Sequence, residues 1–352
     1  MPLSERENYL RSVTMTGPEW IPMRVAISGA VWKQFGREME EVCLRHPTIF
    51  PNFEPGSWKR FSENFGDRHR AGERSSDRWG CVWTDLIDGL EGQVVEHPLA
   101  EWSALDGLPA PDPERVNDWG PIDWQARREQ GERARAAGRL VAGDVSHGFL
   151  FMRLFYLRGF ENFMTDLATG PPELRRLIDL VTAFNLKIVR RWLEMRVELM
   201  SFGDDLGSQT ASMIGPRWFA RWIAPAYRAL MQPCRRAGVH VFLHSDGYIM
   251  DLMDLLIDCG VTIVNPQDLV NGIDNLVREV KGRVSICLDV DRQRIVPFGS
   301  QAEIRDLVEE EVRKLGSPAG GLQLIAGIYP PTPPENVEAL CQAMETFRTY
   351  WS

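Results

Sequence analysis

The amino-acid sequence predicts an α/β protein built as a TIM (β/α)8 barrel with an irregular N-terminal elaboration. The C-terminal half of the chain alternates short apolar segments rich in Val, Ile and Leu with segments of helical spacing. This alternation is typical of successive βα units in a parallel sheet that is covered on both faces. With three candidates further upstream, eight strands are expected, and eight is the number that closes a TIM barrel.

The expected elements follow in chain order. Strands are predicted at 21–28, within 78–97, and at 148–155, 197–205, 239–245, 261–267, 283–291 and 322–328. Helices are predicted at 215–238, 248–260, 272–282, 300–316 and 332–351. The first of these helices opens at Pro216 and stops at Gly238, and Ser300 with Glu303 forms a capping box at the start of another.

The whole chain, residues 1–352, is expected to form a single domain. Residues 50–147 are less regular and contain a stretch rich in Pro, Trp and Asp. They are interpreted either as loops and short helices at the front of the barrel or as a small lid. No GxGxxG or GxxxxGKS motif follows a predicted strand, which weakens a nucleotide-binding function.

Composition excludes several classes of partner. The net charge is −9 and the sequence pI is about 5.3, so nothing would neutralise the phosphates of a nucleic acid. The N-terminal residues lack the apolar core of a signal peptide, and no segment approaches the ~20 apolar residues of a membrane span. The six cysteines are scattered, as expected for reduced thiols. We therefore expect a cytoplasmic protein without a membrane or nucleic-acid partner.

Polar side chains follow several of the predicted strands at the point where each strand ends. They are Asp204 and Asp205, His244 and Asp246, Asn265 and Gln267, Asp289 and Asp291, and Tyr329. In a TIM barrel the C-terminal ends of the strands meet at one rim, where active sites are built. One histidine among so many acids exceeds what turns at a rim require, so the sequence predicts an active site there.

Structural roles compete with this interpretation. Asp246 precedes a glycine and could simply cap the helix that starts at Tyr248. His244 could be a core histidine with satisfied hydrogen bonds, although its place among acids favours a functional role. Cys287 is interpreted as core packing, and the other cysteines and histidines show no ligand spacing, so we interpret them as structural.

Long segments of the chain carry a family resemblance. They are LHSDGYIMDLMDLLIDCGVTIVNPQ, LDVDRQ, GGLQLIAGIYPPTPPENVEAL, residues 157–181 and FGDDLGSQ. These segments resemble the uroporphyrinogen decarboxylase superfamily, whose members are TIM barrels and include cobalamin-dependent methyltransferases. The N-terminal segments RVAISGAVWKQF, DRWGCVW and EHPLAEWSAL look like the methyltransferase branch that is linked to O-demethylation.

Two departures from the family pattern bear on function. Uroporphyrinogen decarboxylases hold the carboxylates of a tetrapyrrole with an N-terminal pair of arginines, whereas the matching stretch here, MRVAISGAVW, contains only Arg24. Methyltransferases that act on coenzyme-type thiols bind zinc through His-x-Cys and a later Cys. Here the matching positions are His244, Asp246 and Ala326, so any metal would have nitrogen and oxygen ligands.

The resemblance implies a methyltransferase that takes a methyl group from a small O-methyl compound, with an aryl methyl ether as one candidate. The acceptor would be the Co(I) centre of a corrinoid partner protein, through which cobalamin takes part. An ether oxygen is a poor leaving group, so it needs an acid, which would be Zn²⁺ or a protonated side chain.

Each candidate residue has an expected role under this hypothesis. The expected catalytic residues are His244, Asp246, Asp205 and Asp289. If zinc is bound, the expected ligands are His244, Asp205 and Asp289. The expected substrate-binding residues are Arg24, Trp83, Asp204, Gln209, Asn265, Asp291 and Tyr329. One alternative is a decarboxylase, which would need cations to bind substrate carboxylates, and Arg24, Arg153 and Arg158 are the candidates for that role. Another alternative is a non-catalytic barrel that binds a small molecule.

Overall fold

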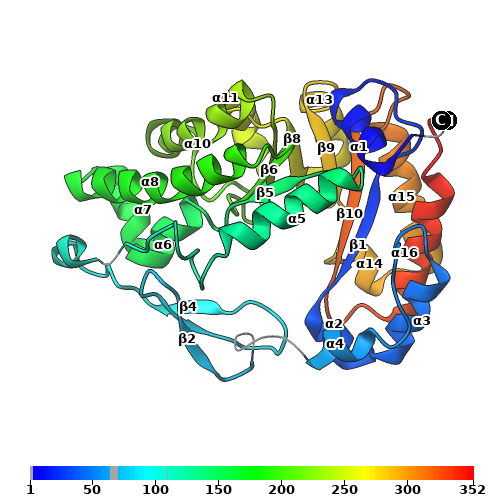
Figure 1. The fold of residues 1–352 in the computed structure, drawn as a ribbon, viewed down its shortest axis with the longest axis horizontal. Coiled ribbons are helices and arrows are strands. Elements are labelled where there is room, and N and C mark those ends of the chain that lie inside the picture. Colours follow the sequence, from blue (N-terminus) through cyan, green and yellow to red (C-terminus); the bar gives the residue numbers. More distant parts are fainter. Residues whose placement is uncertain (1–2, 64–69, 109) are drawn as a thin grey trace. The chain divides into compact units, whose positions relative to one another are not determined.

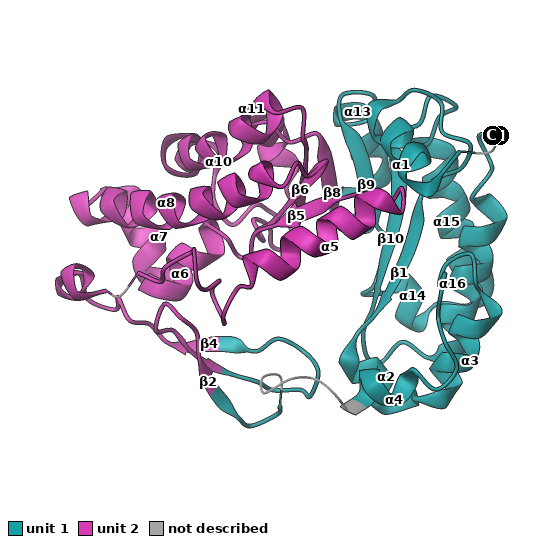
Figure 2. Ribbon diagram, viewed as in Figure 1, with its two compact units in different colours: residues 1–74, 84–93, 267–352 teal, residues 75–83, 94–266 magenta. Residues whose placement is uncertain are grey.

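Residues 3–63, 70–108 and 110–352 are described by the structure, a computed structural model (Figure 1). The chain divides into two units, coloured teal and magenta in Figure 2. Unit 1 consists of Met1–Arg74, Thr84–Gln93 and Gln267–Ser352, and unit 2 consists of Ser75–Trp83 and Val94–Pro266. Both units contain parallel strands joined through helices, so the predicted α/β class is confirmed.

Unit 1 is built on three parallel strands in the order β1–β10–β9. The strands are β1 (Met23–Ile27), β9 (Ser285–Asp289) and β10 (Leu322–Ile328). β1 and β10 lie side by side in Figure 1, with Met23 opposite Leu324 and Ile27 opposite Ile328. The helices of this unit are α1 (Glu5–Thr14), α2 (Gly29–Phe35), α3 (Arg37–Arg45), α4 (Trp58–Glu63), α12 (Asp268–Asn271), α13 (Ile273–Glu279), α14 (Ile295–Phe298), α15 (Gln301–Leu315) and α16 (Pro334–Phe347). The predicted capping box is present at the start of α15.

Unit 2 is built on four parallel strands in the order β8–β7–β6–β5. The strands are β5 (Ala142–Asp144), β6 (Leu199–Gly203), β7 (His240–Ser245) and β8 (Ile263–Pro266). The helices are α5 (Trp124–Ala136), α6 (Phe151–Arg158), α7 (Phe160–Thr169), α8 (Pro172–Glu194), α9 (Pro216–Trp218), α10 (Ala224–Arg236) and α11 (Met253–Cys259), with 3₁₀ turns at Trp102–Gly107 and Met250–Leu252. The single helix predicted over 215–238 is α9 and α10 joined by a π-helical turn at Phe219–Ile223.

The strand predicted at 148–155 is wrong, because residues 148–150 form a turn and residues 151–155 belong to α6. The strand of this βα unit is the shorter β5, which ends at Asp144. Most side chains of α6 are buried, including Phe151 and Leu154. A helix that is buried on most of its sides carries little amphipathic period, so the mostly apolar run could not distinguish it from a strand.

The strand predicted within 78–97 does not join the parallel strands. That segment holds β3 (Val82–Thr84) and β4 (Gln93–Glu96), which form a separate small sheet with β2 (Arg74–Ser76). Within the described residues there are thus seven parallel strands, three in unit 1 and four in unit 2, rather than eight.

The parallel strands of both units bury many of their side chains in the core. All residues of β8 and β9 are buried, as the apolar runs predicted, whereas β7 buries Val241, Leu243 and Ser245 and leaves alternate residues half-buried. The six cysteines are all buried and form no disulfide. Across the described ranges, every helix is too short or too polar to cross a lipid bilayer.

Candidate functional site

The polar strand ends of unit 2 are aligned by the register of the parallel sheet. Gly203 at the end of β6 is the partner of His244 on β7, and His244 is in turn the partner of Asn265 on β8. Partners in adjacent strands point to the same face of a sheet. The side chains of His244 and Asn265 therefore meet, while Gly203, on the other side of the histidine, carries no side chain and leaves room for the ring of His147.

His244 is held by hydrogen bonds at both ring nitrogens. Its Nδ1 lies 2.7 Å from Asn265 Oδ1, and because an amide oxygen accepts, Nδ1 carries the proton of this bond. Its Nε2 lies 3.3 Å from Asp246 Oδ1 and 3.8 Å from Asp205 Oδ1. Burial opposes a positive charge on His244, but the carboxylates of Asp246 and Asp205 outweigh burial and raise its pKa above the ordinary value. Nε2 therefore faces a position that favours a cation or a proton.

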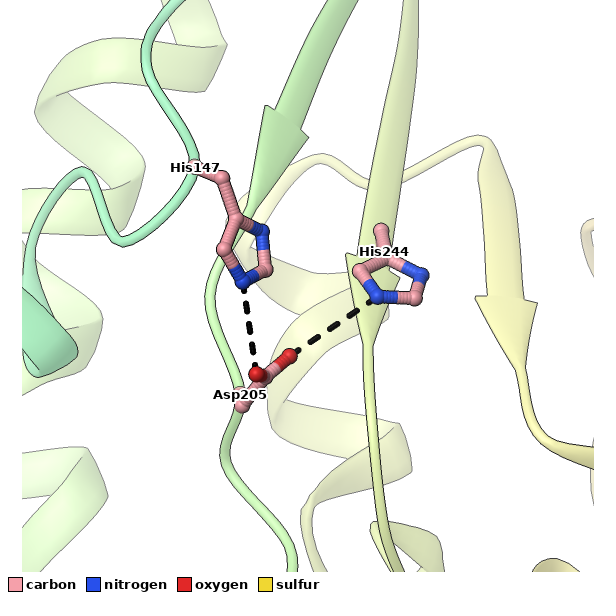
Figure 3. Close-up of side chains that lie close together, drawn as sticks. All are labelled: His147, Asp205 and His244. Atoms are coloured by element: carbon pink, nitrogen blue, oxygen red, sulfur yellow. Dashed lines mark hydrogen bonds and ion pairs between the residues drawn. The ribbon is translucent and has the colours of Figure 1, made fainter. Parts of the chain in front are cut away.

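Asp205 follows β6 and lies between two histidines (Figure 3). Its Oδ2 is 3.3 Å from His147 Nε2, and its Oδ1 accepts a hydrogen bond from the backbone N–H of Asp246 at 3.0 Å. Burial favours the neutral acid, but the hydrogen bond from His147 and the charges of His147 and His244 lower the pKa of Asp205 to about 2. Asp205 is therefore an ionised carboxylate at neutral pH.

His147 comes from the loop after β5 and reaches the site over Gly203. The loop is anchored to β6, because Gly148 donates its backbone N–H to the carbonyl of Gly203 at 2.8 Å. A Cβ atom at Gly203 would lie 2.7 Å from His147 Nδ1, closer than such contacts occur. The absence of a side chain at Gly203 thus gives the imidazole its place.

Three ligand-type groups converge as a result. His147, Asp205 and His244 each offer one ligand atom, and these atoms all lie within 4.8 Å of one another (Figure 3). Two imidazole nitrogens and one carboxylate oxygen suit a divalent transition metal or zinc. The same groups can hold a proton on an imidazole and deliver it to a bound substrate.

Two glycines hold the loops of this cluster together. A Cβ at Gly247 would lie 2.2 Å from the backbone of Gly207, and a Cβ at Gly207 would lie 2.4 Å from the backbone nitrogen of Tyr248. The loops are also joined by hydrogen bonds from Gly207 N to Asp246 O at 3.2 Å and from Tyr248 N to Ser208 O at 2.7 Å. This backbone contact places the loop that carries Asp205 directly against Asp246.

Asp204, expected to bind substrate, is fully buried and anchors α6. Its Oδ2 accepts hydrogen bonds from the backbone N–H of Phe151 and the hydroxyl of Tyr227, and its Oδ1 accepts one from the N–H of Met152, at 2.6–2.9 Å. Burial raises the pKa of Asp204 to about 6 despite these bonds. The structure therefore places Asp204 at the N-terminus of α6, where a carboxylate is stabilised.

The other candidates of unit 2 lie in different surroundings. Trp83 is buried, donates its indole N–H to Asp77 at 3.1 Å and packs against Trp119 with the two rings tilted by 55°. Gln209 is exposed in the loop after β6. Asp246 is partly exposed and contacts His244, while Asn265 orients the ring of His244.

Four of the expected site residues belong to unit 1, namely Arg24, Asp289, Asp291 and Tyr329. Arg24 is exposed on β1. Asp289 is buried with its Oδ2 3.4 Å from Arg292, which also stacks on Tyr329. Asp291 caps its own loop by accepting hydrogen bonds from the backbone N–H groups of residues 293–295. The predicted roles of these residues in catalysis, metal binding and substrate binding stay predictions.

The sequence predicts a structural role for His147, whereas in the structure this residue contributes the second imidazole of the cluster. Its local sequence, DVSHG, follows a strand whose position was mispredicted, so His147 was not seen at a strand end. A strand placed at 142–144 would have put His147 in the same polar rim as Asp205 and His244.

The fold resembles that of proteins with known structures. Among solved structures, a methyltransferase from Methanosarcina mazei matches with a TM-score of 0.59 and 17% sequence identity, over 76% of this chain and 76% of that chain. A D-psicose 3-epimerase matches with a TM-score of 0.41 and 7% identity, over 64% of this chain and 83% of that chain. At such identities a match bears on the fold alone, and the first supports the predicted α/β fold of the TIM-barrel type.

The family assignment comes from the sequence itself. A search of curated proteins found no match. The model of the family described as uroporphyrinogen decarboxylase (URO-D) matches residues 122–347, which include β5 to β10 and the whole His147–Asp205–His244 cluster. This range is well over half of the chain. The chain belongs to the uroporphyrinogen decarboxylase (URO-D) family.

Proposed function

We propose that this protein is a methyltransferase that takes a methyl group from a small O-methyl compound, with an aryl methyl ether as the favoured donor. The acceptor is the Co(I) centre of a separate corrinoid protein. The observation that carries the proposal is the convergence of His244, Asp205 and His147 at the ends of neighbouring strands. A fold of the methyltransferase type and membership of the URO-D family support it.

Transfer of a methyl group from an ether needs an acid at the leaving oxygen, and the His147–Asp205–His244 cluster can supply one. When the methyl group leaves an ether, its oxygen keeps the bonding electron pair and must be protonated or stabilised. The carboxylates around His244 Nε2 favour a proton or a cation at that atom. The balanced products are an alcohol or phenol, which takes one proton, and a methylated corrinoid.

The surrounding residues keep the acid in one orientation. The hydrogen bond between His244 Nδ1 and Asn265 Oδ1 directs Nε2 toward the cluster. Asp205, held by the backbone N–H of Asp246, stabilises positive charge on both imidazoles. A substrate oxygen bound beside His244 Nε2 would thus meet a preorganised acid.

A decarboxylase is supported less well, because two of its three suggested cations are engaged. Arg153 is buried against Asp77 at 2.5 Å and lies 3.4 Å from Asp118. Arg158 is paired with Asp166 at 2.8 Å and donates to backbone carbonyls. Neither guanidinium is placed to hold the carboxylates of a substrate, since leaving Asp77 or Asp166 buried without its partner would be costly.

The test is methyl transfer to cob(I)alamin from a methoxyphenol, followed by the absorbance of the corrinoid and by release of the diphenol. His244→Ala should lower the rate by roughly 10²–10⁴-fold, because it removes the acid at the leaving oxygen. The matched control is His240→Ala, which removes the same residue type from the same strand and face, four residues away. The control should keep the rate of the parent protein.

Two results would overturn the proposal. The first is demethylation of the ether by the purified chain without any corrinoid. The second is a well-folded His244→Ala variant, checked by circular dichroism, with a rate near that of the parent protein, since His244 would then be structural.

A further inference from the structure

We infer that His147, Asp205 and His244 form a binding site for a single zinc ion, with a fourth position open. The ligand set differs from the expected one, because the second imidazole, from His147, takes the place given to Asp289. The catalytic use of the ion rests on the proposed function, but its binding does not.

The spacing of the ligand atoms is close to that of a tetrahedral site. Zinc bonds imidazole and carboxylate at roughly 2.0–2.2 Å, so ligand atoms in a tetrahedron are separated by about 3.4 Å. His147 Nε2 is 3.3 Å from Asp205 Oδ2, and His244 Nε2 is 3.8 Å from Asp205 Oδ1. The three ligand atoms lie within 4.8 Å of one another, so side-chain rotations that bring the most distant pair at most about 1.4 Å closer complete the site.

The ligands are oriented by partners outside the cluster. Asn265 Oδ1 accepts a hydrogen bond from the protonated Nδ1 of His244. The other ring nitrogen, Nε2, then keeps its lone pair for a metal. The backbone N–H of Asp246 holds Asp205 Oδ1 at 3.0 Å, and Asp246 lies in turn on a loop fixed by the Gly207–Gly247 contact. Such outer partners fix ring and carboxylate directions in metal sites and are not needed by a surface ion pair.

The space for His147 is reserved by Gly203. The backbone of Gly203 also accepts the N–H of Gly148, so one residue both anchors the loop and leaves room for the ring. A methyl group there would meet His147 Nδ1 at 2.7 Å and displace the imidazole without touching the other two ligands. Gly203 is therefore a positioning residue of the proposed site.

The donor set matches zinc and indicates how the ion would be used. Two nitrogens and one oxygen without thiolates match three-ligand zinc sites, which keep a position for water or substrate. The carboxylate of Asp246, 3.3 Å from His244 Nε2, lies beside the cluster and can orient what binds at the open position. Zinc held there would polarise the oxygen of a bound ether.

The experiment measures zinc on the whole, freshly purified chain after chelation, by calorimetric titration and by the visible spectrum of the cobalt(II)-substituted protein. We expect one zinc per chain and the absorption bands of tetrahedral cobalt. His147→Ala should weaken zinc binding by more than the roughly 10–100-fold typical of outer partners, and Gly203→Ala by an amount within that range.

Two controls match these variants. His240→Ala removes a histidine from the same strand as His244 but outside the cluster. Gly215→Ala adds a methyl group at a glycine of unit 2 where nothing lies within 4 Å, and its φ of −64° is open to alanine. Both controls should bind zinc like the parent protein, and circular dichroism should show that all variants are folded.

The inference is overturned if the parent protein binds no zinc at micromolar concentrations, or if His147→Ala and Gly203→Ala bind it as the parent does. These outcomes are distinct from failure of the proposed function. Zinc bound by His147 and His244 without methyl transfer from any ether would refute the function and leave the site standing. Full methyl transfer by zinc-free protein would refute the role of the ion and leave the function standing.

Discussion

Glu311 shows how a single buried acid sets a pH dependence of stability. It lies on α15, is fully buried, and neither carboxylate oxygen has a hydrogen-bond donor within the described residues. Burial and the neighbouring carboxylate of Asp268 raise its pKa well above the ordinary value. The folded protein therefore keeps a proton that the unfolded chain releases. Stability from this group is present below the unfolded pKa and is lost as pH rises toward the folded pKa.

Glu311→Gln should flatten this pH dependence. The amide is close in size, carries no ionisable proton and can still donate to Asp268. We expect the variant to be more stable than the parent protein at pH 8 and to lose less stability between pH 5 and pH 8. Urea denaturation at several pH values measures this. Glu309→Gln, a change at a partly exposed carboxylate of α15 that is paired with Arg305, should keep the slope of the parent protein.

The contact between Gly207 and Gly247 is the feature that matters at the scale of elements. Gly247 has a φ of +78°, and a Cβ there would also lie 2.2 Å from the backbone of Gly207. Gly247→Ala should therefore cost more than the ~1–2 kcal/mol of a left-handed alanine, because the loops after β6 and β7 must also separate. Thermal unfolding measures this loss of stability. Zinc binding and methyl transfer should be lost in the same variant.

Gly238→Ala separates the cost of the left-handed backbone conformation from the cost of the close contact between the two loops. Gly238 has a φ of +73°, but nothing lies within 4 Å of a Cβ at this position. This variant should show the cost of the left-handed conformation alone. If Gly247→Ala is no less stable than Gly238→Ala, the close approach of the two loops has no role in holding Asp205 beside Asp246.

The whole chain makes a prediction about substrate. Because Arg153 and Arg158 are engaged within unit 2, and the matching N-terminal stretch contains only Arg24, the protein should not decarboxylate uroporphyrinogen. A polycarboxylate bound without its cations would leave buried charge unpaired. An assay of coproporphyrinogen formation decides this, with an authentic uroporphyrinogen decarboxylase as positive control. Turnover at comparable rates would contradict the prediction.

The sequence determined the parts of this protein that depend on local patterns. Strands β6 to β10 are continuous apolar runs, and each lies where the run predicted it. The cap of α15 was predicted because its signal, Ser300 with Glu303, lies within four residues. His244 and Asp205 could be named because both lie at the ends of strands that were placed correctly, and the polarity change at a strand end is visible in the chain.

Only the tertiary structure decided what depends on contacts between distant residues. Residues 151–155 are helical because Asp204, more than fifty positions away, accepts the first backbone N–H groups of α6, and no local period records this. His147 joins the cluster because Gly203 lacks a Cβ and Asp205 lies beside it. A residue's ligand partners are set by which strands pair and in what register, and that register forms only when the apolar faces are buried together.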